Sequence, residues 1–190
     1  MDRPECVAAL DYLRRHGTES SAAKLSSSLR AAFRAFERKL QQVPEGLRTL
    51  QPAANAWSVH EVVDHLVESD RPAVAELRAL CAGVSPVGGP IPARLQSLNP
   101  FARPWRELVD DLARLHAELL AIVAAADDSA PLVARAPSVI VIKASGASRP
   151  EVLEWVELLD WKAYVQTIRI HTHEHLGHIE RTVAVLAGAG

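Results

Sequence analysis

The chain contains little cysteine and no long apolar run. Only Cys6 and Cys81 are cysteines among its 190 residues, too few for a disulfide framework and typical of a reducing compartment. The longest apolar run without a charge, residues 119–126, is far shorter than the roughly 20 residues that cross a bilayer. The first 17 residues carry scattered charges and lack the apolar centre of a signal peptide. The sequence therefore predicts a cytoplasmic protein with no membrane partner.

The chain also lacks an excess of charge of either sign. Its 21 Lys and Arg residues stand against 23 Asp and Glu residues, a net charge of −2. A protein that binds the phosphate backbone concentrates basic residues, so nucleic acid is not an expected partner. Hydrophobic residues make up 48% of the chain, enough for a core at this length. We therefore expect one domain that covers residues 1–190.

Apolar residues recur at spacings of three and four along the first of four long segments, residues 20–42. This spacing puts them on one face of a helix. Pro44 and Gly46 end the segment. The residues of this apolar face are Leu25, Leu29, Ala32, Phe33, Phe36 and Leu40.

A second helix is predicted to start at Ser58. Glu61 follows three residues later, the spacing of a capping box that satisfies free backbone N–H groups at a helix start. The apolar pattern continues to Gly83. Pro72 lies inside it and lacks a backbone N–H, so we expect a kink or a division of the helix there.

Two further helices complete the pattern. One begins near Pro104 and ends before Pro131. For the last, Ser148 and Glu151 repeat the capping-box spacing and predict a helix over 152–186 with a break near Asp160. Residues 139–142 are the single strand-like run, and we expect one extended segment there because a lone strand cannot form a sheet.

These segments together predict an all-α protein, a four-helix bundle with long connections. The connections are residues 83–103 and 127–149, and residues 1–19 form an N-terminal appendage with a short helix. Bundles of this kind build their sites from side chains that point inward.

Histidines gather near the C-terminal end, where four of the eight lie within residues 171–178. On a helix His171, His175 and His178 share one face, and His173 points elsewhere. Two imidazoles at i and i+4 can bind one divalent cation. His65, among apolar positions of the second helix, is the candidate for a third ligand.

Two motifs carry a resemblance to a known family. The chain resembles the DinB/YfiT-like metalloenzymes, which are four-helix bundles with up-down-down-up topology. The resemblance implies one zinc or nickel ion held by His65, His171 and His175, with a position left open for water or substrate, and it implies a homodimer. The matching residues are Trp57, Ser58, Glu61, His65 and Leu66 in the first motif and His171, His175, His178 and Ile179 in the second.

The resemblance leaves two classes of function open. The chain is either a metal-dependent hydrolase or S-transferase that acts on a small molecule, the latter with a low-molecular-weight thiol, or a non-catalytic bundle that binds metal or a small ligand as a dimeric interaction or stress-response module. An enzyme needs an open metal position, whereas Glu68 or His178 would close a structural site. As catalytic residues, Glu68 shares a helix face with His65 and is a candidate base. His178 is a candidate ligand orienter or substrate contact.

The remaining polar residues near these motifs carry weaker expectations. Glu174 completes the H-x-x-E-H pattern of inverted zinc peptidases, but those enzymes need a third ligand well downstream, and only fifteen residues follow His175. Asp64 is expected to face solvent. His16, His60 and His116 have no evident partner and are expected to be surface or structural residues.

Overall fold

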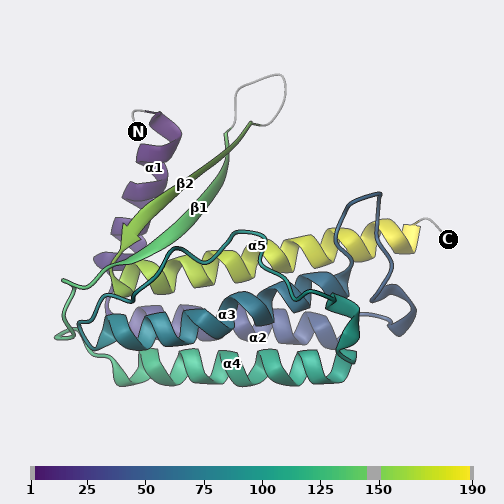
Figure 1. Ribbon diagram of the computed structural model, residues 1–190, viewed down its shortest axis with the longest axis horizontal. Coiled ribbons are helices and arrows are strands. Elements are labelled where there is room, and N and C mark those ends of the chain that lie inside the picture. Colours follow the sequence, from purple (N-terminus) through teal and green to yellow (C-terminus); the bar gives the residue numbers. More distant parts are fainter. Residues whose placement is uncertain (1–2, 145–150, 189–190) are drawn as a thin grey trace.

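Four helices form a bundle in the computed structural model, which describes residues 3–144 and 151–188. They are α2 (Ala22–Gln41), α3 (Val59–Cys81), α4 (Trp105–Ala125) and α5 (Trp161–Gly188). Figure 1 shows α2 and α5 running in one direction and α3 and α4 in the other. The predicted four-helix bundle with up-down-down-up topology is thereby confirmed.

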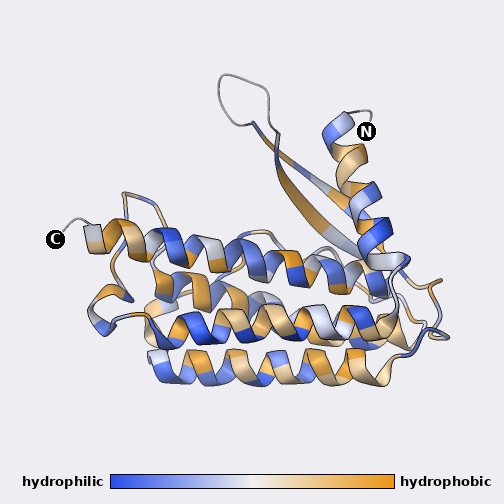
Figure 2. Ribbon diagram, turned by 180° about the vertical axis from the view of Figure 1, so that it is seen from behind, coloured by the Kyte–Doolittle hydropathy of each residue, from blue (hydrophilic) through white to orange (hydrophobic). Residues whose placement is uncertain are grey.

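The bundle is closed by apolar faces that point inward. α3 packs beside α4 and α2 beside α5, and the pairs α2–α4 and α3–α5 close the other two sides. Hydrophobic and hydrophilic residues alternate around each helix (Figure 2). Burial of the apolar faces is the main driving force for this packing. The largest fully buried side chains include Phe33, Phe36, Leu66, Leu77, Leu108, Leu119, Trp161 and Ile179.

The start of α3 has the predicted capping box. The Ser58 side chain accepts a hydrogen bond from the Glu61 backbone N–H, and the Glu61 carboxylate accepts one from the Ser58 N–H. Pro72 does not divide the helix, which runs unbroken from Val59 to Cys81. Apolar residues on both sides of Pro72, among them Val67 and Leu77, are buried in the same core, and this packing outweighs one missing backbone hydrogen bond.

The connection between α3 and α4 is long because these neighbouring helices are parallel. The chain leaves one end of α3 and must return along its 23 residues, about 34 Å, before α4 can begin. Residues 82–104 make this return along the bundle, with a single 3₁₀ turn at Pro100–Ala102 (Figure 1).

The other long connection contains a β-hairpin, which the sequence did not predict. Strand β1 (Ala136–Ala144) pairs antiparallel with β2 (Glu151–Leu159), so that Val139 lies opposite Val156. The helix expected from residue 152 is therefore wrong over β2, and Ser148 lies outside the described residues. β2 alternates exposed and half-buried side chains, the period of a strand. The protein is mainly helical with one two-stranded sheet.

The last helix begins after the expected break. The Asp160 carboxylate accepts hydrogen bonds from the backbone N–H groups of Lys162 and Ala163, so it caps α5. The predicted N-terminal helix is present as α1 (Pro4–Leu13), followed by a π-helical turn. That turn packs tightly on α5, because a Cβ on Gly17 would lie 2.7 Å from the Ala163 Cα. α1 and the hairpin thus stand together over the start of α5 (Figure 1).

Candidate metal centre

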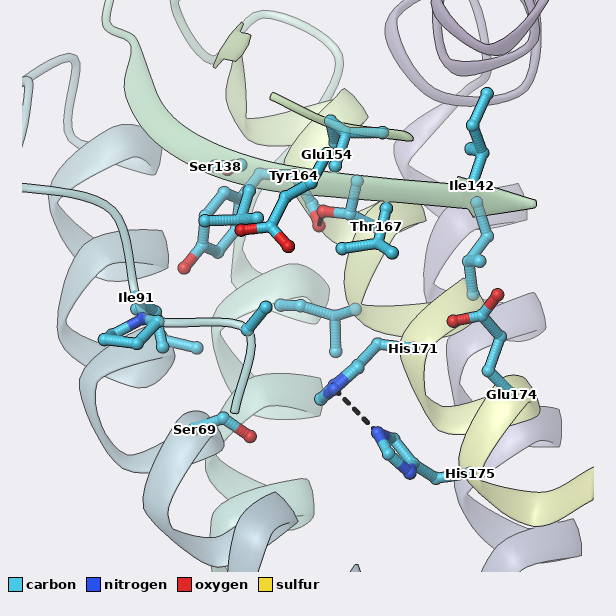
Figure 3. Close-up of a pocket in the computed structure, with 18 of the residues that line it drawn as sticks. Ser69, Ile91, Ser138, Ile142, Glu154, Tyr164, Thr167, His171, Glu174 and His175 are labelled. Carbon is cyan, nitrogen blue, oxygen red and sulfur yellow. Dashed lines mark hydrogen bonds between the residues drawn. The ribbon is translucent and has the colours of Figure 1, made fainter. Parts of the chain in front are cut away.

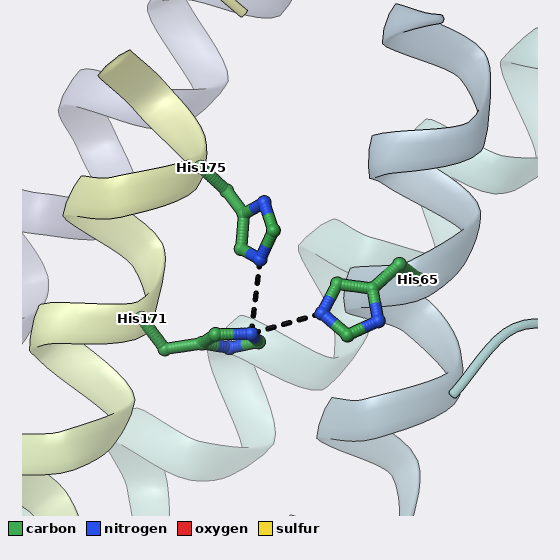
Figure 4. A group of neighbouring side chains, drawn as sticks. All are labelled: His65, His171 and His175. Carbon is green, nitrogen blue, oxygen red and sulfur yellow. Dashed lines mark hydrogen bonds between the residues drawn. The ribbon is translucent and has the colours of Figure 1, made fainter. Parts of the chain in front are cut away.

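Three histidines from two antiparallel helices converge inside the bundle. α3 supplies His65, and α5 supplies His171 and His175, which lie one turn apart (Figure 4). The His171 Nε2 lies 2.9 Å from the His65 Nε2 and 3.1 Å from the His175 Nε2. Ligand nitrogens of all three lie within 4.8 Å of one another. The structure therefore brings together the three residues that the sequence named as metal ligands.

A backbone carbonyl fixes the tautomer of His65. Its Nδ1 lies 2.7 Å from the Leu95 carbonyl oxygen. Because a carbonyl only accepts, the ring hydrogen sits on Nδ1 and the Nε2 lone pair points at the other two histidines. This is the usual partner arrangement of a metal-binding histidine.

Burial keeps the three imidazoles neutral. It lowers the pKa of His171 to about 3 and that of His175 to about 2, and it also lowers the pKa of His65. Neutral imidazole is the form that binds metal. A single hydrogen on the His171 Nε2 can point at the Nε2 of His65 or at that of His175, but not at both. A cation can accept the Nε2 lone pairs of all three histidines.

The spacing of the nitrogens also fits a metal. Two nitrogens on a tetrahedral zinc ion lie about 3.3 Å apart at a Zn–N distance near 2.0 Å. The distances of 2.9 and 3.1 Å in this cluster need only small adjustments to match. Among the residues that the structure describes, the cluster has no fourth histidine, cysteine or carboxylate ligand. The donor set thus suits a divalent cation with an open position.

The three histidines lie in the wall of a cavity of about 650 Å³. The cavity lies between α3 and α5, and α1, both strands and residues 91–94 form the rest of its wall. Figure 3 shows His171 and His175 at one side and Tyr164 and Thr167 further along α5. The hairpin, which the sequence did not predict, thus forms part of the site.

The fold and the site can be compared with known proteins. No known family profile matches the chain, and no curated protein gives a significant sequence match. YfiT from Bacillus subtilis, described as a probable metal-dependent hydrolase with an unusual four-helix bundle topology, is similar in structure, with a TM-score of 0.60 and 14% identity over 87% of each chain. This chain has the YfiT-type bundle fold. TT2238, a four-helix bundle protein, is also similar, with a TM-score of 0.54 and 17% identity over 84% of this chain and 98% of that one.

In this YfiT-type bundle an aromatic side chain covers the histidines. The Trp57 ring lies 5.0 Å from the ring of His65 and stacks near His175 and His178, at 6.3 and 6.4 Å between ring centres. The His178 ring is 6.1 Å from that of His175. His178 therefore adjoins the cluster without joining it, and Trp57 packs beside the rings of His65, His175 and His178.

The structure places Glu68 in an ion pair rather than at the histidines. Arg103 donates to the Glu68 carboxylate at 2.7 Å and to that of Asp64 at 2.8 Å. Glu68 is not among the residues that line the cavity. The expectation that Asp64 faces solvent is wrong, because its side chain is 0% exposed and also accepts from the Ser97 N–H and hydroxyl. These partners come from the 82–104 connection, which sequence periodicity cannot place.

Two of the histidines without an evident partner in the sequence are buried and bonded. The His60 Nε2 donates to the Pro100 carbonyl oxygen at 3.0 Å. The His116 Nδ1 lies 2.9 Å from a Glu37 carboxylate oxygen, and its ring stacks on Phe33. Both are structural residues of the bundle, and neither belongs to the metal cluster.

Asp70, buried in the cavity wall, predicts a pH dependence of stability. Burial raises its pKa from 3.8 to about 6, so the folded chain binds this proton more tightly than the unfolded chain does. Its contribution to the free energy of unfolding is therefore full below pH 4 and is lost as the pH rises through 6, a change of about 3 kcal/mol. Asp70→Asn removes this titration. We expect the variant to gain stability relative to the wild type between pH 4 and 7 in urea unfolding. Parallel pH profiles for the two proteins would contradict this.

Proposed function

We propose that His65, His171 and His175 hold one divalent metal ion, zinc or nickel, and that the protein is a metal-dependent hydrolase of small molecules. The observation that carries the proposal is the convergence in a cavity wall of three neutral imidazole Nε2 atoms, from the buried His65 and the half-buried His171 and His175. The similarity in fold to YfiT, itself described as a probable metal-dependent hydrolase, supports hydrolysis as the reaction class.

The donor set supports an open rather than a structural site. Three protein ligands are typical of catalytic zinc, whereas structural sites are closed by a fourth. In the described part of the chain the cluster offers only these three. When bound, such a metal acidifies a water and polarises a carbonyl oxygen of the substrate.

The chain's own residues orient the site and limit its substrate. The Leu95 carbonyl holds the His65 ring, and Trp57 excludes water from the side of the histidines that it covers. A cavity of about 650 Å³ is of the size that holds small organic ligands. We assign the proton transfer to His178, which adjoins the cavity without lining it and has its ring centre 6.1 Å from that of His175. Burial lowers its pKa, which keeps the imidazole neutral and able to accept a proton.

The proposal is tested by metal removal and return. We expect chelated protein to be inactive on a panel of p-nitrophenyl esters and anilides, and one equivalent of zinc or nickel, measured by plasma mass spectrometry, to restore turnover. His178→Ala should keep the metal and lose about 10²-fold in kcat, the usual worth of a proton-transfer group. His173→Ala is the matched control, because His173 is an exposed histidine on the same helix. It should change neither the metal content nor kcat.

Three results would overturn parts of this proposal. Hydrolysis that survives complete metal removal would contradict a metal-dependent reaction. Stoichiometric metal without hydrolysis, but with turnover of an electrophile that requires an added thiol, would replace the hydrolase with an S-transferase. Absence of stoichiometric metal after reconstitution would leave a non-catalytic helical bundle.

A further inference from the structure

The cavity continues well beyond the histidines along two facing helices. Ser69, Asp70, Ala73 and Glu76 of α3 line it, and so do Tyr164, Thr167, Ile168 and His171 of α5. Because α3 and α5 run antiparallel, Glu76 meets the start of α5, where the Tyr164 hydroxyl donates to its carboxylate at 2.6 Å. We call this Tyr164–Glu76 region the far end of the cavity, and Asp70 lines the cavity about midway along α3 between His65 and Glu76.

The far end lies about 10 Å from the metal cluster. Seven residues separate Tyr164 from His171 on one helix, and each adds about 1.5 Å. Most of the wall between the two ends is apolar and includes Ala73, Ile91, Ile140 and Ile168, while Ser69 and Thr167 are polar. A ligand that fills the cavity therefore has an aliphatic middle with different groups at its two ends.

The charges along the cavity are unevenly placed. Its two basic residues lie at the metal end: Arg94 is next to Leu95, whose carbonyl binds His65, and Lys143 is close enough to Glu174 to lower the pKa of that carboxyl. Glu154 reaches from β2 over the cavity on the side of Tyr164, two residues along the sheet from the pair that Lys143 forms with Val152 (Figure 3). With Asp70 and Glu76 it makes that side of the cavity acidic.

Asp70 is a deeply buried carboxylate of this cavity, and its hydrogen bonds are incomplete. Its residue is only 3% exposed, lines the cavity, and has a carboxylate oxygen with no hydrogen-bond partner in the described part of the chain. The nearest basic atom is the His116 Nε2 at 3.6 Å, and the other nitrogen of that ring is bound to Glu37. A buried carboxylate whose hydrogen bonds are incomplete is costly, and a further donor on its cavity side would stabilise it.

We propose that the far end of the cavity binds a protonated primary amine. Resting on the proposed function, this names the substrate class: a linear molecule whose hydrolysed group lies at the histidines and whose ammonium group lies about 10 Å away, between Asp70, Glu76 and Glu154. An ammonium ion supplies three N–H donors, which match this set of carboxylate acceptors.

The energetics of the carboxylates agree with such a ligand. Burial raises the pKa of Asp70 and of Glu76, so each carboxylate is costly to ionise in the empty cavity. A cation between them favours the ionised forms and offsets that cost. A neutral ligand of the same length gives no such compensation, and a carboxylate ligand adds a like charge.

Calorimetric titration with three probes of equal length tests the inference: n-hexylammonium, n-hexanol and hexanoate. We expect hexylammonium to bind at least about tenfold more tightly than hexanol, the gain typical of hydrogen bonds to a charged group, and hexanoate to bind most weakly. The titrations use both metal-free and zinc-loaded protein. The preference for the cation should hold in both, since the far end contains no metal ligand.

Variants of the acidic residues test where the preference for hexylammonium arises. Glu76→Gln keeps an acceptor for the Tyr164 hydroxyl and should reduce the preference for hexylammonium over hexanol about five- to tenfold, with hexanol binding unchanged. Asp70→Asn should act in the same direction. Glu180→Gln, which removes an exposed charge from α5, is the matched control and should leave all three affinities unchanged.

The outcomes separate this inference from the proposed function. Equal binding of hexylammonium and hexanol, no binding of any probe, or an unchanged preference in both Glu76→Gln and Asp70→Asn overturns the amine site even if the protein binds and uses a metal. A cation preference in a protein that binds no metal supports the amine site and contradicts the proposed metal-dependent hydrolase function.

Discussion

His171→Ala is expected to lower the affinity for zinc at least about 100-fold. His171 is the central member of the cluster, since its Nε2 is the atom that lies near both other ligand nitrogens. Four-ligand zinc sites bind with apparent free energies of about 10–16 kcal/mol, so one ligand corresponds to about 3 kcal/mol. The loss is measured by competition with a fluorescent zinc chelator.

The same variant separates metal binding from folding. A ligand that binds only the folded state stabilises it by about 2.7 kcal/mol when its concentration is 100 times the Kd. Zinc should therefore raise the Tm of the wild type and of His173→Ala, and should leave the Tm of His171→Ala unchanged. Metal-free His171→Ala should still show the helical circular dichroism of the wild type, because the side chain lies in a cavity wall rather than in the apolar core.

A metal-free stability comparison decides what the cluster is for. If the histidines serve only to pack the bundle, His171→Ala will destabilise the metal-free protein, and zinc will not shift the Tm of either protein. If they are metal ligands, truncation relieves the crowding of three neutral rings, and the cost appears only with metal present. The first pattern would refute the metal centre.

The helices of the bundle were predictable because their signals are local. Leu29 and Phe33 recur at helical spacing, and the Ser58–Glu61 capping box lies within four residues. The hairpin was not predictable, because the sequence of β2 fits both the period of a strand and the period of a helix. Four of its residues also fall on one face of a helix: Val152, Trp155, Val156 and Leu159. Only pairing with β1 selects the strand.

The three clustered histidines could be predicted for a related reason. His171 and His175 share a helix face by spacing alone, and the resemblance of the motifs added His65. Residues that act through tertiary contacts could not be predicted from the sequence. Asp64 follows a surface-like pattern on α3, and nothing in the sequence shows that Ser97 and Arg103 return to bury it. The carbonyl that orients His65 belongs to the same returning segment and carries no sequence signal at all.

Arg103→Met is the second change with a large expected effect. It removes a guanidinium that donates to the fully buried Asp64 and to Glu68, and it keeps most of the aliphatic stem. Removal of one partner from a buried ion pair costs about 3–5 kcal/mol, because the other charge stays buried without compensation. The Ser97 N–H and hydroxyl still donate to Asp64, so we expect the lower value, about 3 kcal/mol. Urea unfolding measures it.

Arg106→Met is the matched control for this loss. Arg106 lies two residues into α4 and has a side chain that is 93% exposed, in a pair with Asp110 at 3.9 Å. Exposed pairs of this kind contribute about 0–1 kcal/mol, so its removal should change the free energy of unfolding by less than about 0.5 kcal/mol. Equal losses for the two arginines would show that the burial of Asp64 does not decide the effect.

The Arg103 variant should also weaken the metal site without touching a ligand. Asp64 binds Ser97, two residues after Leu95, and the Leu95 carbonyl fixes the ring of His65. Loss of such an orienting partner costs about 10- to 100-fold in metal affinity. Asp64→Asn combined with Arg103→Met removes the uncompensated charge and should recover most of the stability. Because the amide binds Ser97 less strongly than the carboxylate does, the metal affinity should stay low. Full recovery of both would mean that Arg103 acts on the site only through the stability of the bundle.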